Sequence, residues 1–130
     1  MTVPPEAPRG ERFPASLRLR KRREFLRVQE GGAAVKCAAG PLLALALPNG
    51  SGTTRLGLTV SSKVGNAVVR AHIRRILREL FRKRRGELPA GIDLVFIARP
   101  SAADADFAHF ERAFGEVARR LGERFDGKAR

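Results

Sequence analysis

The chain has 130 residues, enough for one compact domain with a modest core. Its 26 Lys and Arg against 13 Asp and Glu give a formal net charge of +13, which favours a polyanionic partner over a compact isolated protein. No apolar run approaches the roughly 20 residues of a membrane span, and the single cysteine, Cys37, excludes a disulfide framework. We therefore expect a soluble, cytoplasmic protein. Binding to a membrane surface is the weaker alternative, because no aromatic belt or lipidation signal accompanies the basic residues.

The N-terminal part combines a proline-rich stretch with a basic segment. Residues 1–12 are rich in Pro and Gly and are expected to form a flexible tail. The ordered part begins at Phe13, and a short basic helix is predicted near Lys21–Gln29. Gly31 and Gly32 follow directly and are typical of a helix end.

Three strand candidates come next: Ala33–Ala38, Pro41–Leu47 and Thr54–Ser61. The second is nearly continuous in apolar residues and is followed by a turn signal, P-N-G-S-G. In the third, Leu56, Leu58 and Val60 alternate with small or polar residues, the period of a strand with one buried face.

The most informative pattern spans Asn66–Arg85 and predicts an amphipathic helix, with Asn66 as its N-cap. One face carries the apolar residues Val69, Ile73, Ile76, Leu77 and Leu80. The opposite face, or its edge, carries Arg70, Arg74, Arg75, Arg78 and Arg82. Only one acid, Glu79, accompanies eight Lys or Arg, and its spacing predicts an ion pair with Arg75. A row of one sign favours nucleic-acid binding over a merely solvated face.

The last third of the chain predicts one strand and one helix. Ile92–Ala98 is a buried strand, and a core-packing helix starts near Asp106. Its apolar stripe is Phe107, Phe110, Phe114, Val117 and Leu121. Residues 123–130 are expected to be a flexible tail. The order αβββαβα predicts an α/β fold (an α+β sandwich) with a small mixed four-stranded sheet. Together with the basic helix, it predicts one nucleic-acid-binding domain over residues 13–122.

No catalytic or metal-binding constellation is found. His72 and His109 lie in different elements, and neither has the carboxylate spacing of a zinc site. Asp104 and Asp106 are better explained by a helix N-terminus than by a metal pair. The segment S-S-K-V-G has the wrong order for a phosphate-binding loop of a nucleotide triphosphatase. Cys37 fits a small apolar residue in a strand. The chain is therefore expected to bind and position a partner, and any chemical reaction is expected to be carried out outside this chain.

Three segments carry a resemblance to the protein subunit of bacterial ribonuclease P. They are R-L-R-K-R-R-E-F-L-R-V at Arg18–Val28, R-L-G-L-T-V-S-S-K-V-G-N-A-V-V-R at Arg55–Arg70 followed by I-R-R-I-L-R-E, and D-L-V-F-I-A-R-P at Asp93–Pro100. The middle segment is the most specific, and the resemblance covers most of the chain. Ala71 and His72 depart from the family's R-N-R motif.

The resemblance implies a fold, two RNA-binding surfaces and a non-catalytic role for the protein. The fold is of the ribosomal-protein S5 domain 2-like type, with a left-handed crossover. The implied contacts with the catalytic RNA subunit are Asn66, Arg70, Arg74, Arg75, Arg78 and Arg82. A cleft between the first helix and the sheet would receive the 5′ leader of precursor tRNA, with Phe13, Arg18, Lys21, Phe25 and Lys63 at or near it. The RNA subunit, with Mg²⁺ bound mainly to it, would cleave the leader, and one protein is expected per RNA.

Two other functions are weighed against this one. A structural RNA-binding protein, such as a ribosomal protein or an RNA chaperone, fits the size and charge equally well, but it does not account for the segment K-V-G-N-A-V-V-R. A helix-based DNA-binding regulator needs a second helix shortly before the recognition helix, and predicted strands occupy that place.

Overall fold

The computed structural model describes residues 15–126, so residues 1–12, Phe13 and residues 127–130 lie outside the described part. The helices and strands are α1 (Arg22–Gln29), β1 (Val35–Ala39), β2 (Leu42–Pro48), β3 (Arg55–Thr59), α2 (Ala67–Arg84), β4 (Ile92–Ala98) and α3 (Phe107–Leu121). Short helical turns are η2 (Ala15–Leu17), η3 (Arg85–Glu87), η4 (Pro100–Asp104) and η5 (Gly122–Asp126). The predicted order αβββαβα is confirmed.

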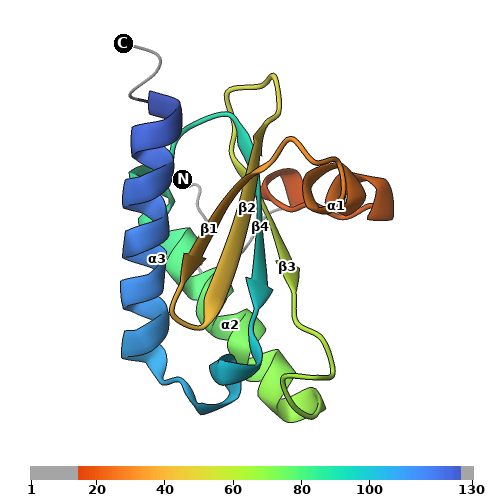
Figure 1. Cartoon of the computed structure of the whole chain (residues 1–130), viewed down its shortest axis with the longest axis vertical. Helices are drawn as coiled ribbons and strands as arrows, with labels where there is room; N and C mark the ends of the chain where they lie inside the picture. The colour runs from red at the N-terminus through yellow and green to blue at the C-terminus, as the bar shows by residue number, and fades with distance from the viewer. Residues whose placement is uncertain (1–14, 127–130) are drawn as a thin grey trace.

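The four strands form one mixed sheet in the order β1-β2-β4-β3. β1 pairs with β2, and β2 with β4, in antiparallel fashion, whereas β3 and β4 are parallel and are joined through α2. In Figure 1 the sheet is seen between α3 on the left and α1 on the right. The predicted sheet of four strands with three helices is therefore confirmed.

The larger core lies between the sheet and the two long helices, α2 and α3. The apolar stripe of α2 is buried at Ile73, Ile76, Leu77 and Leu80. From α3, Phe114 packs against Phe96 of β4, with ring centroids 5.9 Å apart. Each fully buried side chain of this size contributes about 1.5–3 kcal/mol, so this side accounts for most of the apolar stabilisation.

The opposite face of the sheet is covered in part by α1. A smaller cluster, Leu19, Val28, Leu45 and Val95, is buried there. The alternation in β3 predicted one buried face, but Gly57 on its other face is buried as well. The Phe25 ring of α1 lies so close that a Cβ at Gly57 would stand 2.6 Å from its Cε1 atom. The glycine thus allows α1 to approach β3.

The helix ends agree with the capping pattern in the sequence. Asn66 Oδ1 accepts from the Val69 N–H at 3.0 Å, and Asp106 Oδ1 accepts from the His109 N–H at 3.0 Å. The capping role of Asp106 explains why acids stand at the start of α3.

Two expectations for α3 are wrong. Phe107 does not belong to the buried stripe, because its side chain is 45% exposed in the first turn. Residues 123–126, expected in a tail, form a π-helical turn with Gly122, and Phe125 packs against the larger core. The apolar contact of Phe125 explains why the helical backbone continues.

One charged network fastens α1 to the sheet. Asp93 of β4 is only 2% exposed and receives both Nε and Nη2 of Arg55, each at 2.9 Å. Arg55 Nη1 also donates to Glu24 of α1 at 3.1 Å. The backbone N–H groups of Lys21 and Arg20 lower the pKa of Glu24 to about 2, and Arg55 contributes to the same shift. The network therefore holds the start of α1 over the ends of β3 and β4.

We predict that Arg55→Met lowers the free energy of unfolding by about 3 kcal/mol, because it leaves a buried carboxylate without its forked partner. Denaturant unfolding monitored by circular dichroism measures the change. The double variant Arg55→Met/Asp93→Leu should recover most of the loss, since no unpaired buried charge remains. A single variant as stable as the parent would contradict the role of this pair.

Candidate nucleic-acid interface

The outward face of α2 presents cations that no internal partner occupies. Arg75 and Arg78 are exposed, and within residues 15–126 neither side chain forms a hydrogen bond or an ion pair. The stripe Ile73, Ile76 and Leu77 lies on the buried side, so packing fixes the orientation of the helix. A guanidinium group with five free N–H donors suits phosphate oxygens.

The three other arginines of α2 that were expected to bind RNA contact the protein itself. Arg70 Nε donates to the Gly65 carbonyl at 3.1 Å, and Arg74 Nη2 approaches the Val60 carbonyl at 3.5 Å. Both therefore brace the turn that leads into α2 while remaining half-buried. Arg82 Nη2 donates to Glu79 at 2.8 Å, so the expected pair between Glu79 and Arg75 is wrong. The Arg82 hydrogen bond lowers the pKa of Glu79, and Arg75 acts on it only as a more distant charge.

The first part of the same face carries no exposed Lys or Arg. Val68 is 77% exposed, and Ala71 and His72 are exposed beside it. The cationic surface thus begins one turn later, at Arg75, and continues toward the end of α2. Most of the exposed positive charge that has no internal partner therefore lies in the second half of the helix.

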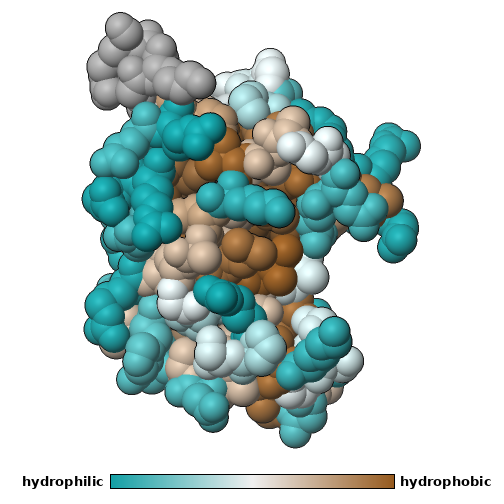
Figure 2. Space-filling model, in the orientation of Figure 1, coloured by the Kyte–Doolittle hydropathy of each residue, from teal (hydrophilic) through white to brown (hydrophobic). Residues whose placement is uncertain are grey.

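A shallow apolar cleft lies on the sheet face that α1 covers incompletely. The strand register aligns Ala38, Leu43, Ile97 and Thr59 in one row across all four strands. Unlike the neighbouring row that contains Leu45 and Val95, this floor row is half-buried or exposed. Figure 2 shows apolar surface near the middle of the visible face and a hollow on the right-hand side below α1. Such a floor with basic borders suits a single strand, whose bases are unstacked.

The residues expected at the leader cleft lie at different points along this face, from the start of β3 to beyond its end. Arg18 bridges to Leu56 at the start of β3, and exposed Lys21 caps α1. Phe25 lies half-buried on Gly57, and exposed Lys63 lies beyond the other end of β3. The structure brings Arg18 and Lys21 together and leaves Lys63 apart, at the turn before α2. Phe13 lies outside the described residues.

Sequence reasoning missed part of the cleft. The floor residues Leu43 and Ile97 were assigned only as buried strand positions, and exposed Lys36 was not assigned to the cleft. Lys36 pairs in register with Leu45 and therefore points to the same face of the sheet. The signal that finds these residues is the cross-strand register, which is a property of the assembled sheet.

A cavity at the start of α1 gathers further positive charge. About 380 Å³ in volume, it is lined by Ser16, Arg18, Arg20, Lys21, Glu24 and Arg55. Four of these six residues are cationic and one is acidic. Glu24 is already engaged by Arg55 and by two backbone N–H groups. The cavity is therefore suited to an anion.

The described residues offer no metal centre. Within residues 15–126, no group of three or more His, Cys, Asp or Glu side chains is gathered where a metal ion could be held. These residues on their own do not fit a magnesium site. None of the helices in the same range is long and apolar enough to cross a membrane.

A cationic helix face and an apolar cleft with basic borders, both on a small α+β domain, define a nucleic-acid-binding protein. The family model described as Ribonuclease P matches residues 13–122. The ribonuclease P protein component of Citrifermentans bemidjiense is 39% identical over 113 residues, covering 87% of this chain and 95% of the relative. That of Caldanaerobacter subterraneus is 41% identical over 90 residues, covering 69% and 76%. The chain belongs to the ribonuclease P protein family.

Solved structures agree with this membership. The ribonuclease P protein of Thermotoga maritima matches with a TM-score of 0.72 and 30% identity, covering 80% of this chain and 96% of that one. The Staphylococcus aureus protein also gives a TM-score of 0.72, at 28% identity, covering 80% and 94%. The predicted family and fold class are therefore confirmed.

Proposed function

We propose that this protein subunit of ribonuclease P binds the catalytic RNA through α2 and the 5′ leader of precursor tRNA through the cleft beside α1. The observation that carries the proposal is the pair of unpartnered, exposed cations Arg75 and Arg78 on a helix whose other face is fixed in the core. The protein thereby assists the removal of the leader in tRNA processing, a cytoplasmic process.

The residues of α2 would contact the RNA subunit to different extents, depending on how many of their N–H groups are already bonded within the protein. Arg75 and Arg78 would bind phosphates directly, because neither side chain forms a hydrogen bond or an ion pair within residues 15–126. Arg70, Arg74 and Arg82 would contact RNA with the N–H groups that remain after their internal bonds. Asn66 caps the helix with its side-chain oxygen and would contribute mainly by ordering the first turn. One protein is expected per RNA.

The leader would lie across the floor row, between α1 and Lys63. Phe25 and the apolar floor offer surface for unstacked bases, and Arg18, Lys21 and Lys63 offer charge for their phosphates. Phe13 is the remaining proposed contact. These interactions do not depend on base identity, as a subunit that handles many precursor tRNAs requires.

The protein would accelerate cleavage by binding and orientation. Two folded RNAs repel one another, and the free arginines lower that repulsion in a salt-dependent way. A leader held at a fixed position reduces the entropy that is lost when the scissile phosphate reaches the catalytic RNA. Mg²⁺, bound mainly by the RNA subunit, would supply the hydrolytic chemistry when present. No protein side chain is assigned a catalytic role.

The direct test is cleavage of a 5′-extended precursor tRNA by the cognate RNA subunit at low magnesium, with and without this protein. Cleavage should appear only with the protein, because magnesium is then too dilute to offset the repulsion between the RNAs. A folded protein that binds the RNA subunit and leaves the rate unchanged would refute the proposed function.

We predict that Arg75→Ala and Arg78→Ala each reduce the slope of log affinity against log salt concentration by roughly one, because each removes about one phosphate contact. Titrations of the RNA subunit at several KCl concentrations give the slope. Arg112→Ala on α3 is the matched control, since it removes the same charge from an exposed position on another element. Equal slopes in the parent and both α2 variants would contradict the assignment of this face.

We predict that Ala38→Glu, at the exposed end of the floor row, weakens binding of precursor tRNA by the reconstituted complex roughly fivefold. One added like charge near a phosphate costs about 1 kcal/mol in water. Binding of mature tRNA, which has no leader, should be unaffected. Ala108→Glu introduces the same change at an exposed position of α3 and should alter neither affinity. Equal losses for precursor and mature tRNA would exclude Ala38 from the leader path.

A further inference from the structure

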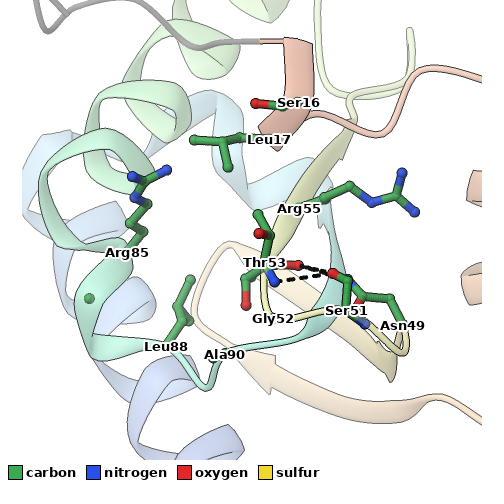
Figure 3. A pocket seen from close by; sticks show the side chains of 12 residues that line it. Ser16, Leu17, Asn49, Ser51, Gly52, Thr53, Arg55, Arg85, Leu88 and Ala90 are labelled. Atoms are coloured by element: carbon green, nitrogen blue, oxygen red, sulfur yellow. Dashed lines mark hydrogen bonds between the residues drawn. The ribbon is translucent and has the colours of Figure 1, made fainter. Parts of the chain in front are cut away.

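A second, larger cavity lies at the end of the sheet opposite to Lys63. It measures about 690 Å³, within the range of sites that hold small organic groups. The turn between β2 and β3 contributes Ser51 and Thr53, the segment after α2 contributes Arg85 and Leu88, and Leu17 comes from η2. In Figure 3, Arg85 and Leu88 stand on one side of the cavity and Ser51 and Thr53 on the other.

The chemistry of the walls is that of a nucleotide site. Leu88 is 7% exposed and, with half-buried Leu17, provides apolar surface for a base. The twelve lining residues include two arginines and no acid. Arg55 is bound to Asp93 and Glu24, and its guanidinium points away from the cavity (Figure 3). Arg85 is exposed, and its side chain has no hydrogen bond or ion pair among residues 15–126.

The acid closest to Arg85 in sequence is already paired with another arginine. Glu87 is bound in a forked pair by Arg84, with N–O distances of 2.7 and 2.8 Å. The guanidinium of Arg85 is therefore available to an external anion at the mouth of the cavity.

The cavity adjoins the smaller cationic cavity at the start of α1. It shares Ser16 and Arg55 with the smaller cationic cavity, which is lined by Arg18 and Lys21. A strand that leaves the floor row past these two cations reaches the larger cavity next. Only an unpaired nucleotide can place a base on the apolar wall, because bases in a duplex are stacked.

We propose that the cavity between Arg85, Leu88 and Thr53 holds a distal nucleotide of the single-stranded leader, upstream of the part in the cleft. The base would lie against Leu17 and Leu88, and Arg85 would bind the adjoining phosphate. This inference rests on the proposed function, since it extends the path of the same leader.

The test compares two precursor tRNAs, with leaders of about three and about twelve nucleotides, which bracket the reach of a small single-strand site. Their affinities are measured for the complex of the RNA subunit with the full chain. The parent should bind the longer leader more tightly. Arg85→Ala and Thr53→Glu should each reduce this ratio about fivefold, and the affinity for the shorter leader should not change. Thr53 suits the test because only its backbone atoms accept or donate hydrogen bonds.

The control is Lys83→Ala, which removes one exposed positive charge close in sequence from a residue that does not line the cavity. It should keep the parent ratio. An equal loss in Lys83→Ala, an equal loss for both leaders in Arg85→Ala, or a parent without preference for the longer leader would each overturn the inference. Cleavage stimulated by the protein in any of these cases would leave the proposed function standing.

A second measurement does not depend on variants. A photoreactive group at the 5′ end of the longer leader should crosslink to the segments around Thr53 or Arg85, and the same group on the shorter leader should not. Crosslinks from the longer leader only to other parts of the protein, or only to RNA, would overturn the inference.

Discussion

The placement of α1 on the sheet depends on one charged network, centred on the ion pair between Arg55 and buried Asp93. Asp93 is nearly inaccessible, and a carboxylate in such a place requires a partner with matching geometry. Arg55 supplies two of its donors to Asp93 and a third to Glu24, so one side chain joins β3, β4 and α1. Because α1 has only eight residues and covers the sheet incompletely, this attachment contributes to where the cleft opens, together with the apolar contacts of Val28 and Phe25. The pair thus contributes position more than net stability.

The helix α2 holds cations in place without neutralising them. Its apolar stripe is packed between the sheet and α3, and the side that faces solvent carries almost no acid. Like charges on one exposed face repel one another, and burial of Ile73, Leu77 and Leu80 offsets that repulsion. The helix backbone that carries the cations is therefore already ordered in the free protein, and little backbone entropy would be lost on binding a polyanion.

Local patterns in the sequence predicted what depends on neighbours along the chain. The bounds of β4 and the caps Asn66 and Asp106 agree with the structure, because periodicity and capping act within a few residues. Asp93 was read only as part of an apolar strand, since its partner Arg55 is 38 positions away and becomes adjacent only in the β3–β4 register. The floor row was not predicted for the same reason, because its residues become neighbours only in the cross-strand register. The prediction that Phe107 is buried was wrong because periodicity gives the face of the helix on which a side chain lies. It does not show whether another element packs against that part of the face.

Ion pairing, rather than the count of basic residues, determines which cations are available to an external anion. Arg55, Arg84 and Arg120 are each tied to acids or carbonyl groups of the protein, so their charges mainly support the fold. Arg75, Arg78 and Arg85 have no such partners within residues 15–126 and lie on α2 or directly after it. The net charge of +13 is thus distributed unevenly: acids accompany the structural arginines, and their scarcity along α2 leaves the binding arginines free. Salt should therefore weaken binding to a polyanion well before it affects folding, because exposed charges are screened much more than the partly buried Arg55–Asp93 pair.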